Sequence, residues 1–140
     1  MAIEQDEMVR LILEALPDLA PTWDEWRAEF KDDPEGPPLF TFLHEVASQV
    51  EEMLRDDDLD GVRLVFDLVE RLNVEGDRDV QMYATLGILE NVQGLAGVDG
   101  DDIVPWGPKF VPYLGPVSKK RWERVEAMWA GTLQGEGLYD

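Results

Sequence analysis

The sequence predicts an all-α protein, and three features indicate this class. Apolar residues recur every three or four positions along most of the chain, as they do on one face of a helix. No run of strand length alternates apolar and polar residues. The 140 residues correspond to one domain, which at this size can bury a core without disulfide bonds. We therefore expect one domain of about six helices over residues 1–133, followed by a loose tail at 134–140.

Two helices are predicted in the N-terminal thirty residues. The first covers the apolar stripe of residues 8–16 and ends at Pro17. Residues 22–25 (Thr-Trp-Asp-Glu) have the form of a capping box, in which the side chains of Thr22 and Glu25 each accept a hydrogen bond from the other's backbone amide. The helix that follows has one aromatic stripe: Trp23, Trp26 and Phe30.

Three longer helices are predicted at residues 39–55, 59–74 and 80–92. The first two each have one apolar face, whereas helix 80–92 is apolar almost all round, which is typical of a helix covered by its neighbours. The turns between them are short, so consecutive helices must be antiparallel. We expect an antiparallel bundle, or HEAT-like hairpins, with helix 80–92 at its centre.

The C-terminal third is predicted to contain one irregular segment and one helix. Residues 94–116 are rich in Gly, Pro and Asp, which favours a long connection without regular structure. Trp106 lies in this segment and is not part of an apolar pattern with helical spacing, so we expect it to be an exposed contact residue. A last helix is expected to open at Ser118, with Trp122 and Trp129 aligned on one face.

Composition excludes several functional classes. The chain has 31 Asp and Glu against 12 Lys and Arg, a formal net charge of −19, which repels nucleic-acid phosphates and anionic membranes. The absence of Cys and the presence of a single His exclude thiol chemistry and any site that needs two imidazoles. The N-terminus is acidic, unlike a secretion signal, and no apolar run approaches the ~20 residues that span a bilayer. We expect a cytoplasmic protein without a cofactor.

An aspartate-rich turn resembles the start of a calcium loop. Residues 56–61 (Asp-Asp-Asp-Leu-Asp-Gly), with Asp67 in the position of the last ligand, fit the EF-hand pattern. However, Arg63 occupies a position that is normally apolar, the last ligand is not Glu, and the apolar stripe of the next helix begins inside the loop. We therefore predict a short turn in which Asp58 or Asp60 is the helix N-cap, and no metal site.

The negative charge is concentrated in the N-terminal half. Residues 1–70 contain 20 acids and 5 bases, whereas residues 71–140 contain 11 acids and 7 bases, so the halves have net charges of −15 and −4. The electrostatic field of this negative charge accelerates association with a basic partner. The alternative is that the charge serves only to keep the protein soluble. We predict a non-catalytic domain that binds a basic protein. The expected partner-binding residues are Glu51, Glu52, Asp56, Asp57, Asp58, Asp60 and Trp106.

Glu90 supports an alternative hypothesis. It lies on the arc of helix 80–92 that should be buried, where a carboxylate needs hydrogen bonds or takes up a proton. We expect it to accept hydrogen bonds from backbone amides of residues 94–100. The alternative is a small enzyme or ligand-binding domain, with a pocket formed by Glu90 and either His44 or Tyr83. His44 itself falls on the polar face of its helix and is expected at the surface.

Four segments bear a resemblance to other proteins: Phe42–Ala47, Val65–Glu70, Gly87–Glu90 and Tyr113–Trp122. In them the chain resembles a set of small, acidic, uncharacterised bacterial proteins, some of them associated with immunity to polymorphic toxins. The resemblance covers roughly residues 40–130 and involves core, cap and turn positions, so it implies a helical fold more than an activity. Together with the acidic charge, it leads us to expect an immunity protein that neutralises a basic toxin or effector.

Overall fold

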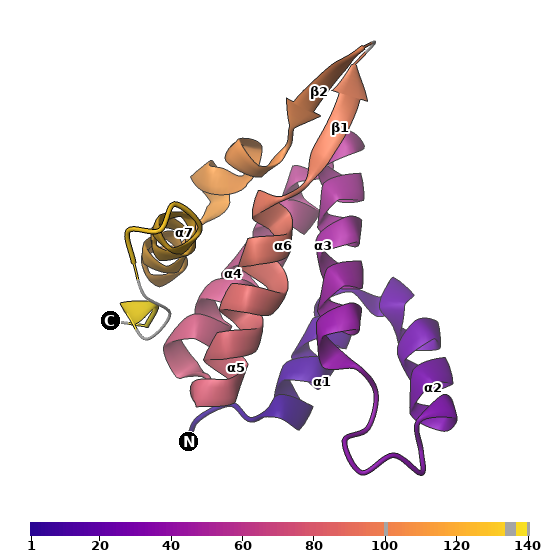
Figure 1. Cartoon of the computed structure of the whole chain (residues 1–140). Coiled ribbons are helices and arrows are strands. Elements are labelled where there is room, and N and C mark those ends of the chain that lie inside the picture. Colours follow the sequence, from indigo (N-terminus) through magenta and orange to yellow (C-terminus); the bar gives the residue numbers. More distant parts are fainter. Residues whose placement is uncertain (100, 134–136, 140) are drawn as a thin grey trace.

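The computed structural model describes residues 1–99, 101–133 and 137–139, and it shows a mainly helical protein with one small sheet (Figure 1). The elements in chain order are α1 (Gln5–Ala15), η1 (Pro17–Leu19), α2 (Ala20–Glu29), α3 (Leu39–Arg55), α4 (Leu59–Glu75), α5 (Arg78–Met82), η2 (Tyr83–Leu89), α6 (Glu90–Gln93), β1 (Ala96–Asp99), β2 (Asp102–Pro105), η3 (Gly107–Tyr113) and α7 (Pro116–Trp129).

The centre of the fold is a layer of antiparallel helices. α3, α4 and the continuous helix formed by α5, η2 and α6 alternate in direction, as expected from the short turns between them (Figure 1). The continuous helix packs against α3, α4 and α7, and its residues Ala84, Ile88 and Leu89 are buried. The prediction that this helix is central is therefore confirmed.

The predicted count of six helices is wrong, because η2 divides the helix expected at 80–92 into α5 and α6. η2 is a π-helix, in which the backbone hydrogen bonds span five residues instead of four. Gly87 lies within η2, and a Cβ atom placed there would come 2.4 Å from Cδ1 of Leu43 on α3. The missing side chain thus allows η2 and α3 to approach closely.

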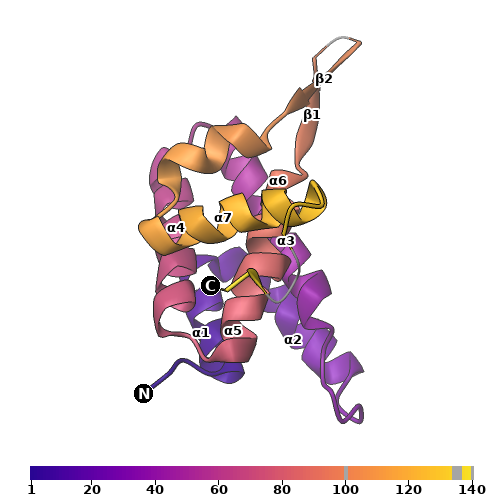
Figure 2. The same cartoon turned by 60° about the vertical axis from the view of Figure 1, so that its left-hand side comes forward.

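The prediction of a purely α-helical class is also wrong. β1 and β2 form an antiparallel hairpin within the segment expected to be irregular, and η3, a 3₁₀-helix, follows it. The hairpin extends beyond the helices (Figure 2). The polar run at residues 99–102 (Asp-Gly-Asp-Asp), between Val98 and the pair Ile103-Val104, contains the Asp-Gly signal of a hairpin, but the strands are too short for alternation to reveal them.

α2 begins earlier than the capping box predicts. It starts at Ala20, directly after η1, so Thr22 already lies in the first turn and no side chain caps the helix. Pro21 is tolerated there because first-turn amides have no acceptor within the helix. The aromatic stripe does contact the core, since the Trp23 and Phe42 ring centroids are 4.7 Å apart.

The last residues that the structure describes pack against the fold rather than forming a loose tail. Leu138 is buried, and the Tyr139 ring lies beneath the guanidinium groups of Arg78 and Arg121, at 4.5 and 4.7 Å. The rest of the predicted tail, residues 134–136 and 140, lies outside the described residues. Over the described chain, no helix combines the length and apolar character required to cross a membrane.

Candidate functional site

The aspartate-rich turn joins α3 to α4 with a tight set of backbone hydrogen bonds. The amide of Asp58 donates to the carbonyl of Met53 (2.8 Å) and that of Asp57 donates to Leu54 (3.2 Å), which is the pattern of a Schellman motif. Asp57 has φ = 60° in that motif, a position usually occupied by Gly. The Asp58 carboxylate accepts a hydrogen bond from the amide of Gly61 (3.1 Å), so Asp58 is the N-cap of α4.

This geometry confirms the predicted short turn and cap. α4 already begins at Leu59, so the residues that a calcium loop would wrap around an ion are helical, and Val62 is fully buried. Within the described ranges, no three His, Cys, Asp or Glu side chains are arranged to hold a metal ion.

The acids predicted to bind a partner differ in how far they are free to do so. Glu51 pairs with Arg55 at 2.8 Å, and its side chain is only 17% exposed. Asp60 pairs with Arg63 at 3.2 Å, and Asp58 is committed to capping. The remaining three are exposed and have no ion pair with a described Lys or Arg: Glu52, Asp56 and Asp57.

Trp106 is half-buried, so the expectation of an exposed side chain is wrong, whereas its contact with a partner stays a prediction. Its ring packs across Gly97 of β1, where a Cβ atom would come within 2.2 Å of the indole Nε1. The Arg55 guanidinium lies 5.7 Å from the ring centroid and the Lys109 ammonium 4.3 Å. Trp106 therefore links the base of the hairpin to the end of α3, which is a connection that helical periodicity cannot predict.

The hairpin presents an apolar face to solvent. Val98 and Ile103 are opposite each other in the register, so their side chains lie on the same face, and each is 78% exposed. Ala96 and Pro105 form the next pair on that face and are also exposed. Sequence reasoning missed these four residues because it assigned no strand to this segment.

The hairpin and the acidic turn lie at the same end of the molecule. Arg55 connects them, since it pairs with Glu51 of α3 and lies over Trp106 at the base of the hairpin. Both views show the hairpin leaving from the end at which α3 stops (Figures 1 and 2). We call this region the hairpin–turn surface. It comprises Glu52, Asp56, Asp57, Ala96, Val98, Ile103 and Pro105.

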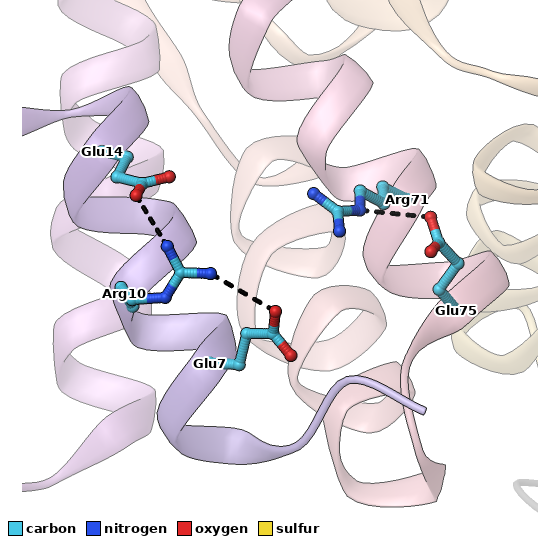
Figure 3. Close-up of polar contacts among 5 residues, drawn as sticks. All are labelled: Glu7, Arg10, Glu14, Arg71 and Glu75. Carbon is cyan, nitrogen blue, oxygen red and sulfur yellow. Dashed lines mark hydrogen bonds and ion pairs between the residues drawn. The ribbon is translucent and has the colours of Figure 1, made fainter. Parts of the chain in front are cut away.

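Elsewhere, Arg10 of α1 and Arg71 of α4 form ion pairs with acids of their own helices. Figure 3 shows Arg10 between Glu7 and Glu14, at 3.3 and 2.7 Å, and Arg71 paired with Glu75 at 3.1 Å. These pairs are three or four residues apart on exposed helix surfaces, where each contributes a few tenths of a kcal/mol. These pairs also reduce the net negative charge on the exposed surfaces of α1 and α4. The hairpin–turn surface, in contrast, keeps acids that have no ion pair with a described Lys or Arg.

Among the described residues, Glu90 lines none of the five main hollows of the surface. Burial raises the pKa of the Glu90 carboxyl, yet no described residue donates a hydrogen bond to it, contrary to the expected contact with backbone amides. His44 is exposed and lies 3.3 Å from Asn91, measured from Nδ1 to Oδ1. Tyr83 precedes Glu90 by seven residues, about 10 Å along a helix, and instead lies beside Phe40.

Glu70 is the carboxylate that accepts the backbone amides. It lies on α4, and its two oxygens accept hydrogen bonds from Val117 (3.1 Å) and Ser118 (2.8 Å) in the first turn of α7. Next to it, buried Asn73 donates to the Ser118 hydroxyl (3.2 Å) and accepts from Thr85 (3.1 Å). These contacts join α4, η2 and α7, so their role is to hold the fold together.

The geometry defines a class: a mainly helical, acidic domain with a projecting hairpin and an exposed apolar face. Comparison with protein families makes this more specific. The model of one family, "Domain of unknown function (DUF7674)", matches residues 9–130, and the chain belongs to that family. Comparisons with curated proteins and with solved structures find no match.

Proposed function

We propose that the protein is a non-catalytic binding domain whose hairpin–turn surface recognises a basic protein. The observation that carries this proposal is the apolar hairpin face, with Val98 and Ile103 each 78% exposed, at the same end of the molecule as the exposed carboxylates of the acidic turn. Apolar side chains that project this far are typical of surfaces that become buried in a complex.

Charge supports a basic partner over a second copy of the chain. Each copy has a formal net charge of −19, so two copies repel each other. Residues 96–105 contain three Asp and no Lys or Arg, and Asp101 and Asp102 near the end of the hairpin are exposed. A partner with Lys and Arg around an apolar centre complements this arrangement.

We further propose that this partner is a toxin or effector and that the protein acts in the cytoplasm as its immunity protein. The support is the acidic charge and the resemblance to bacterial immunity proteins described above. In this role the carboxylates of Glu52, Asp56 and Asp57 take the place of nucleic-acid phosphates at the basic surface of the toxin. A toxin-like gene directly upstream of this one would strengthen the proposal.

The test is affinity capture from the native cell followed by kinetics with the purified partner. We expect a basic protein whose association rate falls at least 10-fold as salt rises from 0.1 to 1 M, because the screening length shrinks from about 10 to about 3 Å. The double variant Val98→Thr, Ile103→Thr keeps β-branched side chains in the strands but removes apolar surface. It should weaken binding about 10-fold.

The matched control is Leu64→Gln, which removes an exposed apolar side chain from α4, away from the hairpin. It should leave the affinity unchanged. A partner that is not basic, or one that binds the double variant and the wild type equally well, contradicts the proposal.

A further inference from the structure

A hollow of about 630 Å³ lies at the end of the molecule opposite the hairpin. It is lined by the loop between α2 and α3, the start of α3, Gln5 of α1 and Tyr83, the first residue of η2. Figure 1 shows that this loop lies at the end of the molecule away from the hairpin. Its walls include three aromatic rings and two acids: Phe30, Phe40, Tyr83, Asp33 and Glu35. The volume is within the range of small-ligand sites in proteins.

The loop that forms one wall is stiff. Pro34, Pro37 and Pro38 restrict its φ angles. The Asp33 carboxylate accepts a hydrogen bond from the amide of Glu35 (2.9 Å), which fixes the turn between the two acids. A wall of this kind is already ordered before a ligand arrives, so binding costs less conformational entropy.

Two aromatic rings of the hollow are available to a ligand. Phe40 and Tyr83 have ring centroids 5.1 Å apart, and Phe40 is 48% exposed although it is fully apolar. Tyr83 begins the π-helix η2, and π-helical turns inside α-helices are frequently found at functional sites.

The chemistry of the walls favours a cation. No Lys or Arg lines this hollow itself, although Arg27 and Lys31 line the adjoining hollow on the other side of Asp33 and Glu35. No ion pair joins Asp33 or Glu35 to either of them or to another described Lys or Arg. Burial raises the pKa of Tyr83, and the charges of Asp79 and Glu35 raise it further, so the negative field reaches the ring. Carboxylates repel an anion, whereas a cation gains both ion pairing and contact with the ring faces.

The chain itself uses the same chemistry at other rings. Its own Lys and Arg side chains lie over the rings of Trp106, Tyr113 and Tyr139, at 4.3 to 5.7 Å. Within the described residues, no such cation lies over Phe40 or Tyr83.

We propose that this hollow binds an organic cation, an alkylammonium or guanidinium group, between the Phe40–Tyr83 rings and the carboxylates of Asp33 and Glu35. The group has two possible sources, a basic side chain of a peptide or a free polyamine. The site is independent of the hairpin–turn surface and extends the function of the protein beyond it.

The test is an NMR titration that follows the ring resonances of Phe40 and Tyr83. The probes are agmatine, spermidine and N-acetyl-lysine methylamide, and the neutral control is N-acetyl-norleucine methylamide. For ligands of this size we expect dissociation constants on the order of 1 mM and no binding of the neutral control. Tighter binding of the lysine probe indicates a peptide, and tighter binding of spermidine indicates a polyamine.

Variants decide whether the cation occupies this site. Glu35→Gln and Tyr83→Leu should each weaken binding roughly two- to five-fold, whereas Tyr83→Phe keeps the aromatic face and should bind like the wild type. Asp102→Asn changes the net charge by the same amount at the hairpin and should have no effect. Equal losses in Glu35→Gln and Asp102→Asn, or ring resonances that do not shift, would overturn the proposal without touching the proposed function.

Discussion

Glu70 gives the sharpest test of how the fold is held together. Its carboxylate is on α4 but accepts the first amides of α7, so it caps a helix that begins 46 residues later in the chain. α7 needs this contact because its own first turn contains no acid and has Lys119, whose charge is unfavourable near the positive end of the helix dipole. The perturbation is Glu70→Ala, with Glu70→Gln as the milder form.

The expected cost follows from the contacts that are lost. Hydrogen bonds to a charged group contribute about 1.5–3 kcal/mol each, and water can partly replace a half-buried carboxylate. We therefore expect Glu70→Ala to lower the free energy of unfolding by about 2–4 kcal/mol and Glu70→Gln by about 1–2 kcal/mol. With an unfolding entropy of about 0.3 kcal/mol/K for a chain of this length, a 3 kcal/mol loss lowers Tm by about 10 °C.

The assay is urea unfolding followed by circular dichroism, with Tm measured in parallel. The matched control is Asp67→Ala, which removes an exposed acid one turn earlier on α4 and should change stability by less than about 0.5 kcal/mol. Gly115→Ala perturbs the contact between Glu70 and α7 from the α7 side, because the added Cβ at this N-cap position would lie 2.4 Å from Cδ of Glu70. Equal stability of Glu70→Ala and Asp67→Ala would refute the reasoning.

Three further predictions concern single residues. Asp57→Gly should be more stable than Asp57→Ala by about 1 kcal/mol in urea unfolding, because the residue has φ = 60°; equal stabilities would contradict this. Thr85→Val should lower the free energy of unfolding by about 1–3 kcal/mol, because it leaves Oδ1 of buried Asn73 without a hydrogen-bond donor, whereas Thr85→Ser should lower it less. The reverse order would argue against the hydrogen bond between Thr85 and Asn73. Burial raises the pKa of Glu90, so the folded state keeps this proton to higher pH than the unfolded chain does. The resulting destabilisation is absent below the unfolded pKa and develops as pH rises through the folded value. Glu90→Gln should therefore gain stability relative to the wild type from pH 4 to 7, and a constant difference would count against this.

The features that could be predicted from the sequence are those that neighbouring residues decide. The sequence predicts the apolar stripe of α4 and narrows its N-cap to Asp58 or Asp60, because a helix face and an N-cap depend on residues within one or two turns; the structure selects Asp58. The short turns before α4 and α5 also required antiparallel neighbours, so the helical layer followed from connection length.

Tertiary structure decided the features that depend on what each residue packs against. The Trp106 ring is half-buried because Gly97 and Arg55 meet it from β1 and α3, and no local pattern encodes that meeting. Val98 and Ile103 are exposed because their strands pair with each other and the hairpin extends away from the helices. A carboxylate with backbone donors was expected from the sequence, but the structure gives that role to Glu70 and not to Glu90. Periodicity can indicate that a face is buried, whereas the partner that satisfies a polar group is determined by contacts between residues far apart in the chain.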